Sequence, residues 1–425
     1  MNHIETPSPI RTKFFTRGTI VITILAALGV FGYVYRLIFG LEAATNLDDQ
    51  WPWGIWIAVD VASGVALAAG GFTTAALADI FHKERYHVIV RPALLTAMLG
   101  YTFVVIGLLA DLGRYYNVWH PMLPDMWQGN SVLFEVGICV MIYLTVLYIE
   151  FLPIVVERFK GRVNLPRPLK FLNPIIESWL HVCEKFLGRF ISLFIIAGVV
   201  LSCLHQSSLG TLMVIAPTKM HPLWYTTISP ALFLLSAIAV GFPMVIFESI
   251  LAAKSFKLKP ETPVLSSIAR YTPILLGVYL AAKVGDITLR NAWGYAFEGS
   301  LESALWWLEI LAGVVAPILL LSNSRIRKSV PGLLTSASLV IGGVVLNRIN
   351  VFLVAYNPLY STKTYFPSIF EIMVTVGLIS MLVLVYRFIV IQLPVISTPI
   401  PEMSPEVEGR RHRVKAGSPT TNKVM

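Results

Sequence analysis

Several ionisable side chains of this sequence lie inside long apolar runs, where a charge is costly in lipid and therefore marks a candidate site. Carboxylates and imidazoles can transfer protons, whereas guanidinium and amide groups can donate hydrogen bonds to a carbonyl oxygen. The candidates for proton transfer are Glu135, His205 and Asp60. The candidates for binding are Trp51, Trp53, Asp111, Arg114, Gln206 and Arg348. Together these residues are candidates for one functional site inside the membrane.

Other kinds of chemistry lack the residue patterns that they need. The three cysteines, Cys139, Cys183 and Cys203, form no CxxC pair and no spacing typical of zinc or iron-sulfur ligation, so we expect no metal site. Of the eight histidines only His205 lies well inside an apolar run, and a membrane haem needs ligands from facing helices, so we expect no haem. No phosphate-binding glycine loop and no serine nucleophile elbow occurs.

The elements that must position these residues are membrane-spanning helices. Hydrophobic residues make up 56% of the 425 residues and charged residues only 13%, a balance typical of an integral membrane protein. A bilayer core of roughly 30 Å needs about 20 apolar residues per helix. Runs of that length occur near residues 19–39, 55–81, 93–113, 131–156, 190–207, 228–251, 270–288, 301–321, 330–354 and 369–392. We therefore expect an all-α protein with about ten transmembrane helices, and an amphipathic stretch before the fifth, Ile175 to Arg189, could lie along the membrane interface.

The basic residues predict the orientation of these helices. Of the 33 Lys and Arg residues, 26 fall in the two tails, in every second loop or at the flanking helix ends. Basic loops are typically cytoplasmic, so both termini should be cytoplasmic and the number of spans should be even. The chain then divides into a cytoplasmic N-terminal tail (1–18), a transmembrane helical domain (19–397) and a disordered cytoplasmic tail (398–425), whose Pro, Glu, Ser and Arg content favours disorder.

With this orientation most candidates cluster toward the extracytoplasmic side. Asp60 lies about 8 Å into the second helix. Asp111 with Arg114, and Lys283 with Asp286, are three residues apart, so each pair can meet on one helix face. Nine of the ten tryptophans fall on the same side of the membrane. An aromatic-rich outer face suits a docked partner or a flat aromatic ligand, although an asymmetric interfacial belt would have the same pattern.

Several stretches resemble the polysulfide-reductase-type (NrfD/PsrC) family of quinone-reactive membrane subunits, and within it the HybB-type membrane subunits of periplasmic nickel-iron hydrogenases. The stretches are WPWGIWIAVD at 51–60, DLGRYYN at 111–117, NSVLFE at 130–135, LHQSSLGTLM at 204–213, HPLW at 221–224, VAYNP at 354–358 and YFP at 365–367. They span nearly the whole chain, and they share a predicted position near the outer face.

The resemblance implies a subunit of the bacterial inner membrane that carries no haem or cluster of its own. It would receive electrons from a four-cluster ferredoxin-like iron-sulfur subunit docked on the periplasmic face and pass them to a quinone, with menaquinone expected. The implied catalytic partner is a nickel-iron hydrogenase with its small and large subunits, so that the complex would act as a hydrogen:quinone oxidoreductase in anaerobic respiration. A molybdenum-enzyme partner is the alternative, and a secondary transporter or a passive anchor are rivals from other classes.

A quinone takes up two electrons and two protons, so its site needs donors for two carbonyl oxygens and a route for protons. We hypothesise that the candidate residues surround the quinone head group, with His205 or Arg348 donating to a carbonyl and Glu135 relaying protons from outside. Protons from the cytoplasm would instead follow an inner path marked by Asp79, Glu150 and Glu248. Each of these residues could also be no more than a buried polar group with its hydrogen bonds satisfied.

Overall fold

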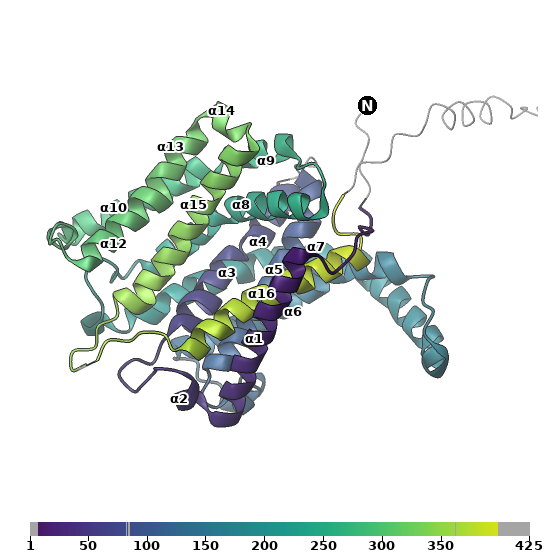
Figure 1. Cartoon of the computed structure of the whole chain (residues 1–425), viewed down its shortest axis with the longest axis horizontal. Coiled ribbons are helices and arrows are strands. Elements are labelled where there is room, and N and C mark those ends of the chain that lie inside the picture. Colours follow the sequence, from purple (N-terminus) through teal and green to yellow (C-terminus); the bar gives the residue numbers. More distant parts are fainter. Residues whose placement is uncertain (1–6, 82, 84–85, 362, 398–425) are drawn as a thin grey trace, which may run out of the picture.

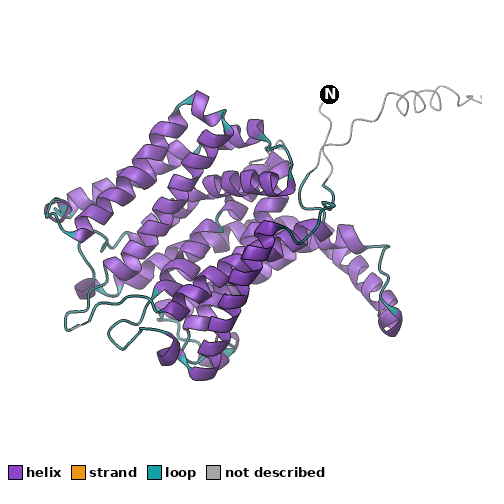
Figure 2. Ribbon diagram, in the orientation of Figure 1, coloured by secondary structure: helices purple, strands orange, loops and turns teal. Residues whose placement is uncertain are grey.

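The computed structural model describes residues 7–397 except 82, 84, 85 and 362 (Figure 1). Within this part the chain is almost wholly helical, and no strand forms (Figure 2). Ten of the described helical segments are long and apolar enough to cross a membrane, which confirms the predicted all-α class and the number of spans. The predicted tail at 398–425 lies outside the described residues.

The first five spans precede residue 215. The first, third, fourth and fifth are α1 (Arg17–Phe39), α5 (His87–Asp111), α6 (Val132–Phe159) and α7 (Asn173–Val214). The second span is interrupted and consists of η1 (Trp56–Ser63), α3 (Gly64–Leu67), α4 (Gly70–Ala75) and η2 (Ala76–Ile80).

The last five spans follow residue 228. They are α8 (Ser229–Phe256), α9 (Thr262–Ala269) with α10 (Thr272–Leu289), α12 (Leu301–Ile310) with η9 (Leu311–Val315) and α13 (Ala316–Ser322), α15 (Val330–Ile349) with η10 (Asn350–Val354), and α16 (Ile369–Gln392). Short helices lie in the connecting loops: α2 (Leu41–Ala44), η4 (Tyr115–Asn117), η5 (His120–Met122), η6 (Pro124–Met126), η7 (Arg167–Leu172), η8 (Pro217–Lys219), α11 (Trp293–Ala296) and α14 (Ser324–Arg327).

Three spans contain wide π-helical turns. The second span contains η1 and η2, the eighth contains η9 and the ninth contains η10. A π turn inserts an extra residue into the helix and re-aims the side chains around it, and such turns are frequent at functional sites. Asp60 lies within η1, Glu309 comes two residues before η9, and Asn350 begins η10. The π turns therefore accompany buried polar residues.

The spans pack as two groups and a closing pair. α5, α6 and α7 lie with the second span on one side, while α10, α13 and α15 pack with α8 on the other. α1 and α16 lie side by side, and α16 also packs against α5 (Figure 1). The two helices approach so closely that a Cβ atom added to Gly29 would lie 2.3 Å from the Cα atom of Gly377. Neither position has room for a side chain.

Both ends of the described chain lie on one face of the bundle, which we call the terminal face. The backbone N–H of Ser8 donates to the carbonyl of Ile396 (3.3 Å), and Arg387 donates to the carbonyls of Lys13 (2.8 Å) and Phe14 (3.0 Å). The opposite face, the distal face, is formed by the loops at 40–55, 112–131, 215–228, 290–300 and 355–368. That the terminal face is cytoplasmic stays a prediction.

One helix extends well beyond the bundle. α7 has 42 residues, and at ~1.5 Å per residue it is about 63 Å long, twice the roughly 30 Å of a bilayer core. The first half of α7, which includes the predicted amphipathic stretch, projects sideways from the bundle near the terminal face (Figures 1 and 2).

Candidate functional site

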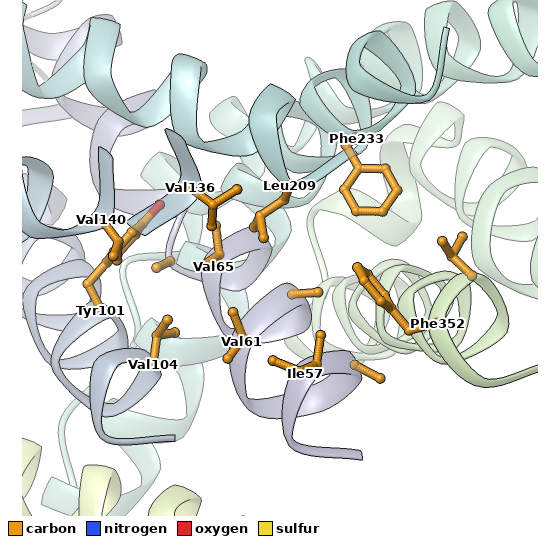
Figure 3. Packing of buried hydrophobic residues seen from close by; sticks show 14 of the residues in the cluster. Ile57, Val61, Val65, Tyr101, Val104, Val136, Val140, Leu209, Phe233 and Phe352 are labelled. Atoms are coloured by element: carbon orange, nitrogen blue, oxygen red, sulfur yellow. The ribbon is translucent and has the colours of Figure 1, made fainter. Parts of the chain in front are cut away.

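A cavity of about 420 Å³, the distal cavity, lies among the second span, α5, α6 and α7 near the distal face. Its walls are mostly aliphatic, and Figure 3 shows Ile57, Val61, Val136, Val140 and Leu209 among the residues that line it. The loop after α5 adds three polar side chains at the edge of the cavity: Arg114, Asn117 and His120. This volume and this lining are typical of sites for small, mainly apolar ligands.

The helical repeat explains why α6 presents an apolar wall. Leu133, Val136, Gly137, Val140 and Met141 line the cavity and are spaced three and four residues apart, so they share one face of the helix. A Cβ atom added to Gly137 would find no atom of another element within 4 Å. The wall is therefore open at that position.

Buried polar side chains meet one helical turn below the cavity. The Nδ1 atom of His205 lies 3.2 Å from the Oη atom of Tyr101, and the Tyr101 ring stands edge-on to Tyr143 with centroids 4.5 Å apart. Gln206 donates from Nε2 to the carbonyl of Val65 (2.7 Å), while its Oε1 atom has no hydrogen-bond partner among the described residues. These polar side chains, which we call the polar floor, are buried beneath the aliphatic lining and do not themselves line the cavity.

Four of the predicted site residues lie at this cavity or beneath it, and a fifth, Glu135, lies on one of its helices but faces away. Trp53 and Arg114 line the cavity, and His205 and Gln206 lie beneath it. Glu135 is exposed and lies about 200° around α6 from the lining residue two positions before it. The structure therefore does not bring Glu135 to the cavity.

Asp60 lies on the other side of the second span, toward α16. Its Oδ2 atom accepts a hydrogen bond from the Oγ1 atom of Thr375 (2.7 Å). α5 can approach this carboxylate because Gly107 has no side chain: a Cβ atom there would lie 2.9 Å from the Cβ atom of Asp60. Asp60 also lines a separate crevice of about 380 Å³ between α15 and α16, whose walls are otherwise mostly apolar.

Asp111 belongs with Asp60 rather than with the cavity. It lies close enough to Asp60, Arg36 and Glu371 to interact with them electrostatically, and its Oδ1 atom has no hydrogen-bond partner in the described part of the chain. Arg36 is buried and donates to the carbonyls that end α5, at Ala110 and Leu112. Arg36 therefore donates hydrogen bonds to the end of α5 and also places a positive charge near the Asp111 carboxylate.

Trp51 fixes the distal loops and does not line the cavity. Its Nε1 atom donates to the carbonyl of Lys363 (3.1 Å). Beside it, Tyr365 donates to a carboxylate oxygen of Glu371 and accepts from the backbone N–H of Ile55 (2.9 Å). Burial and the bond to the Glu371 carboxylate raise the pKa of Tyr365 well above its usual value, so the phenol keeps the proton that it donates.

Arg348 lies in the other helix group, away from the cavity. Its guanidinium donates to the Oδ1 atom of Asn347 (2.6 Å) and to the Oγ atom of Ser236 (2.8 Å), and it stacks over the ring of Phe233 at 3.7 Å. It is fully buried. Arg348 is therefore part of a polar cluster between α8 and α15.

Glu309 is the centre of that cluster, which we call the buried ion network. It forms an ion pair with Lys283, and both side chains are almost completely buried. The carboxylate also accepts from the Nε1 atom of Trp224 (3.0 Å) and from the Nδ2 atoms of Asn347 (2.9 Å) and Asn350 (3.0 Å). All four neighbours donate to Glu309, so a negative charge there is well satisfied.

The two pairs expected from spacing do not form. Lys283 pairs with Glu309 of α12, and Asp286 instead receives the guanidinium of Arg290, four residues further on (2.7 Å). Asp111 makes no described ion pair with the arginine three residues after it, because α5 ends at Asp111 and the chain then leaves the helical path. Lys283 therefore pairs with a residue of another helix, and Asp286 pairs with a residue one turn further along the chain, instead of with each other.

A series of aromatic rings connects the distal cavity with the buried ion network. Trp53 packs edge-on against Phe352, and Phe352 against Phe233, with ring centroids 6.3 Å apart in both contacts. Figure 3 shows the rings of Phe352 and Phe233. Arg348 stacks on the same Phe233 ring. Arg348 therefore reaches the cavity wall only through two rings.

Tyr101, Tyr143 and Arg36 were not among the site residues predicted from the sequence. Their positions in the sequence could have indicated them. Both tyrosines fall in the middle of predicted spans, where a buried phenol needs a hydrogen-bond partner, and Arg36 is a charged residue inside the first span.

These features together define an integral membrane protein with a ligand-sized cavity between its helices. Residues 43–359 match the family described as Polysulphide reductase, NrfD, and the chain belongs to this family. The match confirms the resemblance seen in the motifs.

Relatives over most of the chain include membrane subunits of oxidoreductases. The chain is 39% identical over 406 residues to a protein of Nitratidesulfovibrio vulgaris strain Hildenborough (93% of this chain, 97% of that protein). It is 31% identical over 394 residues to the probable Ni/Fe-hydrogenase 2 b-type cytochrome subunit of Escherichia coli K12 (92% and 95%). It is 25% identical over 361 residues to the menaquinone reductase integral membrane subunit of the same Nitratidesulfovibrio strain (79% and 81%).

The name of the second relative includes a b-type cytochrome, but the described histidines of this chain do not fit a membrane haem. His205 is buried against Tyr101, and His87 is exposed at the first residue of α5, beside Asp79. His181 is exposed on the projecting part of α7, and His120 and His221 lie in distal loops. A haem between membrane helices needs two ligands that face each other. The described histidines offer no such facing pair between two membrane-spanning helices.

Proposed function

We propose that this chain is the quinone-reactive membrane subunit of a periplasm-facing respiratory oxidoreductase, and that the quinone head group binds in the distal cavity. The cavity carries the proposal, because its volume and aliphatic walls suit a flat bicyclic ring with an apolar tail. Arg114, Asn117 and His120 can donate to one carbonyl oxygen at the edge, and Trp53 offers a ring for stacking. Menaquinone is the expected substrate, in keeping with the relative named menaquinone reductase.

The polar floor supports protonation of the second carbonyl oxygen. His205 and Tyr101 are hydrogen-bonded to each other one turn beneath the cavity, so a proton can pass along the pair toward a ring above. We place His205 as the proton donor and Tyr101 as the residue that orients it. Asp60 and Glu135 stay proposed relay residues, at the crevice toward α16 and at the exposed face of α6 respectively.

The loop after α5 offers a docking surface for the electron donor. Tyr116, Trp119, Met122 and Trp127 are exposed on it, beside the polar edge of the cavity. Exposed aromatic residues and methionines are enriched at protein interfaces. A ferredoxin-like iron-sulfur subunit docked here would bring its cluster next to the quinone, and the distal face would then be periplasmic in a bacterial inner membrane.

The catalytic partner that we favour is a nickel-iron hydrogenase, in keeping with the Escherichia coli relative. The test is hydrogen-dependent menaquinone reduction by membranes with and without this subunit, alongside dye-linked hydrogenase activity and a pull-down of partners. We expect loss of quinone reduction only, with dye reduction retained and hydrogenase subunits recovered. Persistence of both activities would overturn the proposal, and recovery of a molybdenum enzyme would replace the hydrogenase by the alternative partner.

We further propose that protons reach Asp60 from the terminal face. Glu248 lies beside Thr96 and Tyr386; Thr96 lines the crevice that holds Asp60, and Tyr386 lines a pocket of about 290 Å³ at the terminal face. The side-chain oxygens of all three are buried, and the Glu248 carboxylate lies close enough to the hydroxyls of Thr96 and Tyr386 to interact with both. Buried polar atoms are normally paired with protein groups or with ordered water. A chain of hydrogen bonds through these three residues would conduct protons.

Glu248→Gln should uncouple turnover from charge movement. Electrons that arrive at the distal face and protons that come from the terminal face would build a membrane potential, and the amide cannot carry the proton. In proteoliposomes with the assembled complex we expect the potential per quinone reduced to fall by about tenfold or more. Glu157→Gln, at an exposed carboxylate on the same face, is the matched control. An unchanged potential in the Glu248 variant would exclude this route.

A further inference from the structure

The projecting part of α7 and the loop before it form one unit, residues 160–189, which we call the arm. The loop runs back along the helix and is fastened to it at three places. Lys160 pairs with Glu184, the backbone N–H of Gly161 donates to Glu177, and the backbone N–H of Leu165 donates to the Oδ1 atom of Asn173 (3.1 Å). The arm is therefore a folded hairpin and not a loose extension.

The arm runs across the direction of the spans. In Figure 1 the spans α1, α15 and α16 run from the distal face at the lower left to the terminal face at the upper right, whereas the arm points to the lower right. It begins at the terminal end of α6. An element that leaves a span at the membrane surface in this direction lies along the plane of the membrane.

One face of the arm is apolar and exposed. Ile175, Trp179, Val182 and Phe186 are spaced four, three and four residues apart, so they form one stripe, and Trp179 and Val182 are 54% and 62% exposed. The arm already has an inner side that packs on the bundle and the loop, where Leu187 is 4% exposed. The outer stripe takes no part in that packing.

The charges of the arm are mainly positive. The arm contains six basic and two acidic residues. Both acidic residues have partners within the arm: Glu184 forms an ion pair with Lys160, and Glu177 accepts a hydrogen bond from the backbone N–H of Gly161. No carboxylate of the described chain forms an ion pair with the other basic residues, Arg162, Arg167, Lys170, Lys185 and Arg189. Lys185 and Arg189 adjoin the apolar stripe.

We propose that the arm is an interfacial helix that binds anionic phospholipid at the terminal face. An apolar stripe bordered by unpaired cations is the pattern of helices that lie in the headgroup region, where Lys and Arg attract anionic lipids. A tryptophan in the stripe suits the same depth. A crevice of about 510 Å³ lies in the angle between α6 and the arm, and it has room for an acyl chain. Its apolar lining residues are Pro153, Val156, Leu187 and Ile191, and its polar ones are Glu157, Lys160 and Glu184.

The first test measures the depth of the arm residue by residue. The full chain, with its three cysteines replaced, is labelled with a nitroxide at single cysteines placed from 174 to 189 and inserted into nanodiscs that contain phosphatidylglycerol. We expect oxygen accessibility to exceed that of a water-soluble nickel reagent at 175, 179, 182 and 186, and the reverse at 178, 181 and 185. Labels that all report water would show that the arm stands in the solvent, where its stripe would serve a protein or a second copy, and would overturn the proposal.

The second test distinguishes lipid binding by the basic residues of the arm from a general effect of charge reversal on the protein. Reversing Arg167, Lys170, Lys185 and Arg189 to glutamate should reduce the phosphatidylglycerol that co-purifies with the protein, relative to phosphatidylcholine, by at least about tenfold. The matched control reverses Lys254, Lys257 and Lys259, which lie on the same face outside the arm. Equal losses in the two variants, or none in the arm variant, would overturn the assignment to the arm.

Discussion

Gly137→Trp should reduce quinone-linked turnover to background while the complex assembles and reduces dye normally. Gly137 lines the distal cavity, and there is open space where its side chain would be, so the indole can enter the cavity without displacing a helix. A quinone displaced by even about 1 Å loses roughly 100-fold in rate, and an indole in its place removes the site altogether. Hydrogen-dependent menaquinone reduction and dye reduction, measured on the same purified complex, check this result.

The matched control for this variant is Gly277→Trp. Gly277 also lies within a span, in α10, and it also has open space around its missing side chain, but it does not line the cavity. We expect the control to retain quinone-linked turnover. If Gly137→Trp turns over quinone as fast as Gly277→Trp, the quinone binds elsewhere, and the crevice that holds Asp60 becomes the next candidate.

Glu309→Gln should destabilise the protein by about 3–5 kcal/mol, because it leaves the ammonium of Lys283 buried without a counter-charge. The amide also fits less well, since all four neighbours of Glu309 donate hydrogen bonds to it and the new NH₂ group is itself a donor. The midpoint of thermal unfolding in nanodiscs measures the effect.

Two further variants make this result interpretable. Removing both charges, in Lys283→Met with Glu309→Gln, should recover part of the lost stability, because no unpaired charge then remains. Glu157→Gln removes one partner of the partly exposed ion pair with Arg91, and we expect a change of about 0–1 kcal/mol. A Glu309 variant as stable as the Glu157 variant would show that the buried ion network contributes little.

The sequence was sufficient for the fold class because lipid imposes both length and composition on a spanning helix. The ten apolar runs therefore correspond to the ten spans, and intramembrane charges such as Asp60 and Arg348 were recognisable as buried. The π turns were not predictable, since they depend on how each helix meets its neighbours.

The composition of the site was harder to predict, because a residue's type does not reveal its partner. Lys283 has an aspartate three residues away but pairs with Glu309 on another span, where burial makes the pairing stronger. Glu135 and the cavity residue Val136 are adjacent in the sequence, yet they face different surroundings. Apolar residues that line a cavity also have the same types as those that face lipid, so only the packing distinguishes them.

The contact between α1 and α16 bears on the order in which the protein can be completed during synthesis. Each early part of the site relies on a late one: the carboxylate of Asp60 is held by Thr375, the indole of Trp56 donates to the carbonyl of Glu371, and Gly29 meets Gly377. The second span must therefore wait in the membrane, with a carboxylate lacking its partner, until the tenth has been inserted. Among the described spans, α16 is synthesised last and completes these contacts, so a chain halted before it would keep its earlier spans but not the environment of Asp60.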